Sequence, residues 1–347
     1  MLALAGYPLG LEFVFLDPAA DACAAPLGDH LRAEYTDPQA LMEFCRRIDI
    51  ATYEFENVPD ETARFVSGLK PLHPSPRALA VGQDRMTEKQ LFDELGIPVP
   101  NYEPVGSRDD LDRVICNLGY PAMLKTRQLG YDGKGQAVLR TAEDLGPAWE
   151  KLGRQPLLLE SFVAFEREIS CIGVRGANQQ LSFYPVTENV HRNGILRTSI
   201  PRLNDPMQAL AESHAGRLME HLDYVGVLAF EFFVAGGKLY GNEIAPRVHN
   251  SGHWTIDGAH CSQFENHLRA IAGWPLGSTA LRGPCAMVNF IGDLPDLGKL
   301  VQFPGLHLHL YGKSPKPGRK IGHATLTAAT DADLAVALAQ LGKLIPG

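Results

Sequence analysis

The chain has 347 residues, more than one ordinary compact core holds, and this length suits two or three connected domains. Its formal net charge of −8 excludes a nucleic-acid backbone as the main partner but is compatible with a local phosphate pocket. No apolar run approaches the roughly 20 residues that span a bilayer, and the apolar start lacks the basic segment of a signal peptide. The six cysteines are widely spaced without a C-x-x-C pair, which favours reduced thiols. We therefore expect a cytoplasmic protein with no membrane partner.

Helices and strands alternate at the start of the chain, which predicts a parallel sheet with crossover helices. The predicted elements are a helix over 1–5, a strand over 11–16, a helix over 38–47, a strand over 50–54 and a helix over 59–69. Such a domain normally opens with a strand, whereas this chain begins inside a helix. We therefore expect its first strand and the following turn to be missing. The proline-rich segment 71–76 predicts a domain boundary.

Beyond that boundary the pattern mixes helices with strands joined by short turns. The first predicted helix, over 85–95, carries lysine and glutamate on what we expect to be its exposed face. The elements that follow are helices over 109–118, 206–223, 261–272 and 332–344, with Asp331 as N-cap of the last, and strands over 121–125, 157–160, 167–174, 180–186, 226–234, 238–244, 285–291, 306–311 and 322–328.

Two glutamates occupy a predicted hairpin in which a carboxylate is unexpected. Glu231 lies in the apolar run GVLAFEFFV, where a carboxylate is costly to bury unless a cation pairs with it. Glu243 is equally far from Gly237, so the two face each other if the hairpin loop has an odd number of residues. Mg²⁺ would suit such a pair, with Asn242 as a neutral neighbour. With a two-residue loop, the alternative is that the glutamates lie on opposite faces.

A lysine and a glycine-rich loop precede this hairpin. Lys125 follows a buried strand and could pair with nucleotide phosphates, although a surface lysine is the commoner case. The loop over 128–136, QLGYDGKGQ, lets backbone N–H groups approach phosphates, although a plain hairpin turn is the alternative. It matches neither a Walker loop nor a dinucleotide fingerprint. Together with paired glutamates downstream, these features indicate phosphoryl transfer.

Two further segments suit an anionic substrate. Arginine, histidine and asparagine crowd the loop over 246–253, directly after Glu243, where an acceptor should lie. A basic cluster in GKSPKPGRKIGH could hold a substrate phosphate. A hydrogen-bonded polar turn and a solvated basic loop are the respective alternatives. The cluster comprises Lys313, Lys316, Arg319 and Lys320.

The order of these motifs resembles the 5-(carboxyamino)imidazole ribonucleotide synthases, ATP-grasp enzymes of purine synthesis. The resemblance runs over nearly the whole chain and is carried by Arg85, Lys125, GYDGKGQ (130–136), Glu160, Glu168, Glu231, NEIAPRVHNSGHW (242–254) and PGRKIGH (317–323). It implies an α/β and α+β fold in three parts. These are an N-terminal α/β domain over 1–76, a two-lobed ATP-grasp domain over 77–275 with its lid lobe at about 109–165, and a small C-terminal domain over 276–347.

The resemblance also implies a role for each motif residue. ATP would contact Arg85, Lys125, the lid residues Gly130, Tyr131, Asp132, Gly133, Lys134, Gly135 and Gln136, the hinge residues Glu160, Ser161, Phe162 and Val163, and Glu168, His191, Asn242 and Glu243. Mg²⁺ would bind Glu231 and Glu243. The ribonucleotide and bicarbonate would contact Tyr131, Asp132, Arg247, His249, Asn250, Lys313 and Arg319. The residues implied in catalysis are Asp132, Arg247, His249 and Lys313.

The implied reaction has two stages. ATP phosphorylates bicarbonate to carboxyphosphate, and the amine of 5-aminoimidazole ribonucleotide then takes the carboxyl group, either directly or after CO₂ release. Asp132 is the candidate for handling the proton of the amine. The resemblance further implies a homodimer, and family members normally begin with a strand and a glycine-rich turn that this sequence lacks. A different ATP-grasp ligase and a catalytically inactive nucleotide-binding or scaffold protein are the rival interpretations.

Overall fold

The N-terminal region is built around a short parallel pair of strands. The computed structural model describes residues 1–130 and 133–345. Strand β1 (Val14–Leu16) pairs in parallel with β2 (Asp29–Leu31), close to α1 (Leu2–Gly6), α2 (Pro38–Arg47) and α3 (Asp60–Ser67). Helix α2 begins where the Asp37 carboxylate accepts hydrogen bonds from two backbone N–H groups, and it ends in two arginines that suit the helix dipole.

The strand predicted over 50–54 is wrong. Of this segment only Ala51 makes a β-type contact, an isolated parallel bridge to Leu72. Tyr53 is instead turned into the core, where its hydroxyl donates to the Pro74 carbonyl. The alternating pattern of this segment therefore reflects burial within a loop and not a continuous ladder.

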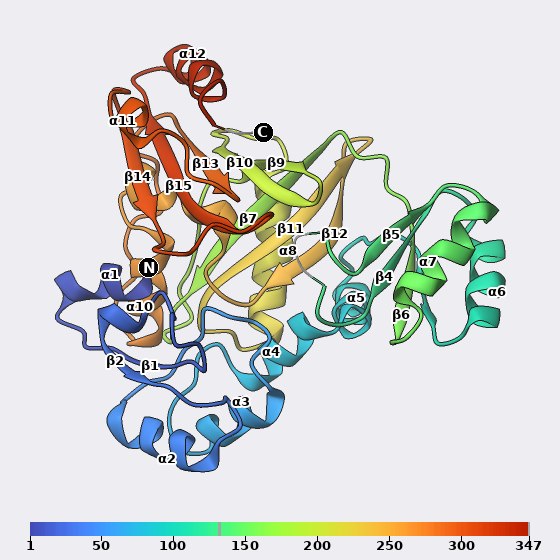
Figure 1. The fold of residues 1–347 in the computed structure, drawn as a ribbon, viewed down its shortest axis with the longest axis horizontal. Helices are drawn as coiled ribbons and strands as arrows, with labels where there is room; N and C mark the ends of the chain where they lie inside the picture. Colours follow the sequence, from blue (N-terminus) through green and yellow to red (C-terminus); the bar gives the residue numbers. More distant parts are fainter. Residues whose placement is uncertain (131–132, 346–347) are drawn as a thin grey trace.

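A four-stranded antiparallel lobe follows, and Figure 1 shows that it projects to the right of the view, beyond β11 and β12. Its strands run in the order β3 (Tyr102–Val105), β6 (Leu157–Ser161), β4 (Ala122–Thr126) and β5 (Gln136–Leu139). Helices α6 (Arg108–Leu118) and α7 (Leu145–Leu152) bury their apolar faces against the sheet. Helices α4 (Pro76–Gln83) and α5 (Arg85–Glu94) connect this lobe with the N-terminal region.

The largest layer is a nine-stranded antiparallel sheet (Figure 1). Its strands are β7 (Arg167–Arg175), β8 (Leu181–Phe183), β9 (Thr187–Arg192), β10 (Ile195–Pro201), β11 (Gly226–Ala235), β12 (Lys238–Ala245), β13 (Cys285–Ile291), β14 (Leu306–Leu310) and β15 (Lys320–Thr327). Their order is β12-β11-β7-β9-β10-β13-β15-β14, with β8 on β7. The helices of this part are α8 (Gln208–His221), α9 (Thr255–Gly258), α10 (Gln263–Ile271), α11 (Leu297–Leu300) and α12 (Asp331–Leu341).

Strand β11 is covered on both faces, which explains its apolar sequence. Leu228 and Phe230 pack into the core that includes α8, while Val227 and Ala229 pack into the core that includes α10. Side chains alternate along a strand, so Glu231 belongs to the same face as Ala229. No helix among the described residues is long and apolar enough to cross a membrane.

Two other expectations need correction. The single strand predicted over 180–186 is β8, which ends at Phe183, and a hairpin of β9 and β10 follows. The two-residue turn of that hairpin, Asn193-Gly194, has both φ angles positive and was the signal that would have predicted it. Asp331 is the first residue of α12 and not its N-cap, because the Thr330 side chain accepts the capping hydrogen bond.

Candidate active site

Glu231 and Glu243 are directly paired across β11 and β12, but the reason differs from the one expected. The loop has only two residues, Gly236 and Gly237, so the expectation of an odd loop is wrong. A β-bulge shifts the register between Phe232 and Glu231 and leaves one extra residue on β12, Asn242. The bulge therefore brings the two carboxylates onto the same face.

The carboxylates of Glu231 and Glu243 lie in different electrostatic environments. Burial, followed by the charge of Glu243, raises the pKa of Glu231 well above its usual range. Burial also raises the pKa of Glu243, but the Arg85 guanidinium outweighs this effect, and its Nη1 lies 2.7 Å from Glu243 Oε2, so the net shift is downward. The carboxyl group of Glu231 ionises with difficulty beside the charged Glu243. A cation between the two would favour the ionised form of both.

The donor set fits Mg²⁺ delivered with a nucleotide. Among the described residues no group of three or more His, Cys, Asp or Glu side chains is arranged to hold a metal ion. Mg²⁺ commonly takes one or two carboxylates and completes its shell with phosphate oxygens and water. Glu231 and Glu243 therefore suit a metal that is bound together with phosphates, not one enclosed by protein ligands alone.

Lys125 is paired with a buried carboxylate from the adjacent strand. Its Nζ lies 2.7 Å from Glu160 Oε2, and Glu160 Oε1 lies 3.8 Å from Lys89 Nζ. Burial raises the pKa of Glu160, but Lys125 and then Lys89 outweigh it and lower the pKa to about 2. Glu160 thus stays charged and neutralises two lysines in the absence of an anionic ligand.

The residues after Glu160 were predicted to hold adenine through the backbone. Ser161 ends β6 and donates its N–H to the Asn101 carbonyl, while the Phe162 N–H donates to the Pro121 carbonyl. The Phe162 side chain is exposed. Val163 follows in an irregular segment beyond the strand.

The glycine-rich loop lies between β4 and β5, with Tyr131 and Asp132 outside the described residues. Gly133 and Gly135 have φ angles of +73° and +71°, which disfavour any side chain. The Gly135 carbonyl accepts from the Thr126 N–H. A Cβ on Gly133 would lie 2.9 Å from Gly194 Cα, so the loop contacts the β9–β10 turn of the large sheet. Gly130 directly precedes Tyr131, and Lys134 lies between Gly133 and Gly135 in the sequence. Gln136 is the first residue of β5 and pairs with Lys125.

The loop after β12 delivers Arg247 and His249 to the same place as the glutamates. His249 Nε2 lies 3.7 Å from Glu231 Oε1, and its Nδ1 is 2.8 Å from the Ser251 hydroxyl. Burial, followed by the charge of Arg247, lowers the pKa of His249 well below its usual range, which keeps the ring neutral. Arg247 forms an ion pair at 2.7 Å with Glu56 of the N-terminal region.

One pocket brings together five of the predicted site residues. Glu231, Glu243 and Arg85 line it together with Arg247 and His249. Leu129 belongs to the predicted glycine-rich loop, and Ile244 and Ala245 belong to the motif over 242–254. The lining residues outside the predicted motifs are Glu56, Asn57, Gly82, Gln83, Glu88 and Arg127.

Other predicted residues lie outside that lining. Glu168 and His191 form their own ion pair, 2.5 Å from Oε2 to Nδ1. Asn250 exchanges side-chain hydrogen bonds with Asn289 at 3.1 and 2.7 Å. Lys313 lies over the Tyr311 ring, and Arg319 donates to the Ser314 carbonyl.

Lys320, the inner end of the basic cluster, is near enough for its charge to lower the pKa of His249. The basic cluster therefore approaches the pocket without lining it in the described structure.

The prediction that α5 exposes its lysine and glutamate is wrong. Glu88 and Lys89 are 2% and 0% exposed. Glu88 and Lys89 follow Arg85 by three and four residues, so both share a helix face with Arg85 that is turned toward β12. The Asp84 side chain caps α5 and also pairs with Arg127. This spacing was visible in the sequence, but charged residues normally indicate a solvated face.

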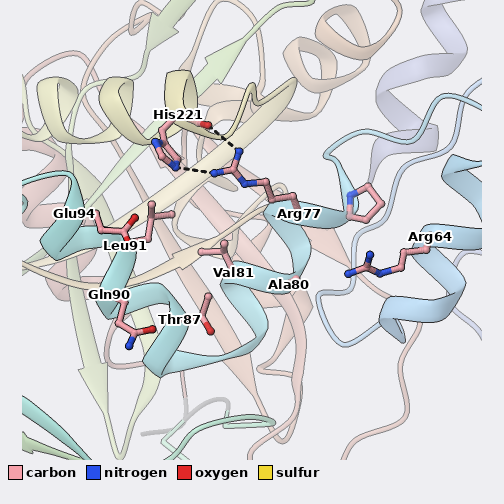
Figure 2. Close-up of a pocket in the computed structure, with 10 residues that line it drawn as sticks. Arg64, Arg77, Ala80, Val81, Thr87, Gln90, Leu91, Glu94 and His221 are labelled. Carbon is pink, nitrogen blue, oxygen red and sulfur yellow. Dashed lines mark hydrogen bonds between the residues drawn. The ribbon is translucent and has the colours of Figure 1, made fainter.

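A second hollow lies between α4, α5 and the end of α8 (Figure 2). There the Arg77 guanidinium donates to His221, with Nη2 at 2.7 Å from Nε2 and Nη1 at 3.3 Å from the carbonyl. Among the described residues, none of the predicted site residues lines it. Within the described part of the chain, this hollow therefore shares no lining residue with the pocket of the paired glutamates.

Comparisons with known proteins place this pocket in context. Three family models match consecutive parts of the chain: the Ribonucleotide synthetase preATP-grasp domain over 1–83, the ATP-grasp domain over 90–264 and the Phosphoribosylaminoimidazole carboxylase C-terminal domain over 285–336. The N5-carboxyaminoimidazole ribonucleotide synthase of Pseudomonas aeruginosa is 54% identical over 345 residues, which cover 99% of this chain and 96% of the relative.

Solved structures of the same family are similar to this chain over almost its whole length. The crystal structure of N5-carboxyaminoimidazole ribonucleotide synthetase from Thermus thermophilus is similar with a TM-score of 0.95 and 51% identity, over 100% of this chain and 96% of that one. The enzyme from Aspergillus clavatus in complex with ADP and 5-aminoimidazole ribonucleotide has a TM-score of 0.92 and 29% identity, over 99% and 94%.

An antiparallel lobe facing a large sheet, with arginine side chains and paired carboxylates in a pocket between them, defines an ATP-grasp ligase. The resemblance found in the sequence is confirmed. The chain belongs to the N5-carboxyaminoimidazole ribonucleotide synthase family.

Proposed function

We propose that this chain carboxylates 5-aminoimidazole ribonucleotide with bicarbonate and ATP. The products would be 5-(carboxyamino)imidazole ribonucleotide, ADP and phosphate, formed through carboxyphosphate in de novo purine (IMP) biosynthesis. The observation that carries the proposal is the pocket itself, where Glu231 and Glu243 lie beside the guanidinium groups of Arg85 and Arg247. Such a pocket can neutralise ATP phosphates on one side and receive an anionic acceptor on the other.

Glu231 and Glu243 would hold Mg²⁺, which neutralises charge as the phosphoryl group moves. Arg85 and Lys125 would contact the phosphates, and Glu160 would release Lys125 toward them. The remaining proposed nucleotide contacts are the lid over 130–136, the hinge over 160–163, Glu168, His191 and Asn242. The support is that Lys125 pairs with Glu160 and that Glu168 pairs with His191. Asn242 directly precedes Glu243 on β12.

Arg247 and His249 would face the ribonucleotide and bicarbonate. Because His249 is held neutral, it can accept a hydrogen bond from the substrate or donate one without adding charge. Asp132 and Tyr131 would complete this side, with Asp132 receiving the amine's proton. Asn250 would support the loop, and Lys313 with Arg319 would bind the ribonucleotide phosphate if their loop moves over the pocket.

The decisive assay couples ADP release to substrate addition. ADP should form only when both 5-aminoimidazole ribonucleotide and bicarbonate are present. Release that ignores both would contradict the assignment and favour another ATP-grasp ligase, such as a formate-using transformylase or a biotin carboxylase. Binding of Mg-ATP without turnover under any acceptor would favour a scaffold.

We propose the domain limits 1–76, 77–275 and 276–347, supported by separate apolar cores around Leu41, Leu124 and Phe290. We further propose a cytoplasmic homodimer. Sedimentation velocity of the purified chain tests the assembly, and a single species at 37.9 kDa, the mass of one chain, would contradict it.

A further inference from the structure

A buried lysine of α5 binds the backbone of the β-bulge that pairs the two glutamates. Lys89 Nζ donates to the carbonyls of Gly241 and Asn242, each at 2.9 Å. These two residues form the bulge, where the regular ladder is interrupted. The Lys89 side chain is 0% exposed, so no solvent replaces these bonds.

Helix α5 also holds the strand on the other side of the bulge. The Ile244 N–H donates to Glu88 Oε1 at 2.6 Å. Consecutive residues of α5 therefore bind β12 immediately before and immediately after Glu243. The Gly241 N–H donates to the Pro98 carbonyl at 2.7 Å, and a Cβ on Gly241 would lie 3.2 Å from the Phe92 ring. The bulge thus has no room to slide toward the helix.

A buried lysine at this position lowers the stability of the fold unless its ammonium group has specific partners. Burying an ammonium group costs several kcal/mol in the absence of partners. Its ammonium group donates hydrogen bonds to two carbonyls here, and the charge of Glu160, whose Oε1 is 3.8 Å away, attracts it further. An apolar residue would leave both bulge carbonyls buried without donors.

The regular register would destroy the glutamate pair. The two-residue loop sets Phe232 opposite Gly241, and without the bulge the next pairs would be Glu231 with Asn242 and Phe230 with Glu243. Because side chains alternate, Glu243 would then point to the face opposite Glu231. The bulge is therefore required for a two-carboxylate site.

We propose that Lys89 is a positioning residue of the metal site. By binding both bulge carbonyls it keeps Glu243 opposite Glu231, and it thereby sets the affinity for the divalent cation. This inference rests on the proposed Mg²⁺ site. Lys89 does not touch the cation itself in this scheme, and its effect passes through the backbone of β12.

The test measures cation affinity directly, with Mn²⁺ followed by electron paramagnetic resonance on the full chain in the presence of ADP. Lys89→Met should weaken Mn²⁺ binding about tenfold or more, as expected for two lost buried hydrogen bonds. Lys89→Gln keeps an NH2 group on a shorter, uncharged side chain and should fall in between, and Lys89→Arg should stay within about threefold of the wild type. The matched control is Lys238→Met, an exposed lysine at the other end of β12, which should leave affinity unchanged.

Thermal unfolding of each variant identifies those that fold, and Lys89→Gln keeps the test available if Lys89→Met does not. A folded Lys89→Met or Lys89→Gln with Mn²⁺ affinity within twofold of wild type overturns the proposal, even if its melting temperature falls. The variant Glu243→Gln distinguishes a failure of the proposed metal site from a failure of the proposed role of Lys89. If Glu243→Gln loses Mn²⁺ while the Lys89 variants keep it, the metal site stands and only the role of Lys89 fails. If Glu243→Gln binds Mn²⁺ normally, both fail.

Discussion

At the scale of single residues, the site depends on charges that the fold keeps in opposition. Lys125 and Glu160 neutralise each other at 2.7 Å, and Arg85 does the same for Glu243. In the proposed function, a nucleotide phosphate would replace Glu160 as the partner of Lys125, and a divalent cation would replace Arg85 as the partner of Glu243. The sequence predicted Lys125, Arg85 and the glutamates as functional, but it did not predict these pairings, which join residues far apart along the chain.

The carboxylate pair can be tested by removing one charge. Glu243→Gln should lower kcat/KM about 100-fold or more, because transition-state charge would lose part of its stabilisation, as when one preorganised group is removed from other active sites. Higher Mg²⁺ should not restore the wild-type rate. The measurement is ADP release over a Mg²⁺ series, with Glu220→Gln on the exposed side of α8 as control. Equal rates for Glu243→Gln and wild type would contradict the metal assignment.

Glu160 should contribute stability with a defined pH dependence. Its folded-state pKa is lowered from 4.5 to about 2, so the contribution is fully present above pH 4.5 and is lost as pH falls toward 2. Glu160→Gln should therefore cost about 3 kcal/mol in the free energy of unfolding at pH 7.

Urea unfolding from pH 7 down to pH 4 checks this expectation. The gap between wild type and Glu160→Gln should be constant above pH 5 and should narrow below pH 4.5. Glu150→Gln, an exposed change on α7, should show no gap. A gap that widens on acidification would show that Glu160 is not held charged by the lysines.

At the scale of elements, two departures from regular structure shape the site. One is the bulge in β12, which offsets an even-length hairpin loop so that the glutamates meet. The other is the glycine-rich loop, which contacts the β9–β10 turn through Gly133. Both place backbone where a regular ladder could not.

The lid contact can be tested at Gly133. Gly133→Ala adds a Cβ at a φ of +73° and against Gly194, so the loop must move away from the turn. A strain of about 1–2 kcal/mol predicts a loss of about tenfold in kcat/KM for ATP. Gly146→Ala in α7 meets nothing within 4 Å and serves as control. If steady-state kinetics show the same kcat/KM for Gly133→Ala and wild type, the loop contact has no part in nucleotide binding.

At the scale of the whole molecule, the pocket lies where separate parts of the chain meet. Glu56 comes from the N-terminal region, Arg127 follows β4 of the four-stranded lobe, and Glu231 belongs to the large sheet. A ligand that touches all three should hold them together. Binding should therefore stabilise the folded chain as a unit.

A thermal shift tests this coupling. ADP with Mg²⁺ at about 100 times its dissociation constant should add about 2.7 kcal/mol and raise the melting temperature by about 4 °C for a chain of this size. Chelation of the metal with EDTA should remove most of the shift. AMP, which lacks the β-phosphate, is the control ligand. A shift that is equal with and without metal would contradict a nucleotide-linked cation site.

The sequence by itself determined the family and the type of chemistry. The order of Lys125, the glycine-rich loop, Glu231 and Glu243 is local information, because each motif is contiguous or falls on one strand. Most helices and strands followed for the same reason, since their apolar periodicity records which face is buried. Helix α2 and the β11–β12 hairpin are examples.

Only the tertiary structure decided how those residues meet. The register of β11 and β12 depends on a bulge whose extra residue has no distinct sequence signature. The spacing of Glu231 and Glu243 in the sequence therefore could not predict why they face each other. The burial of Glu88 and Lys89 was equally hidden, because a charged residue is stable in a core only when distant partners satisfy it. The β12 partners of these two side chains lie 156 and 152 positions away along the chain.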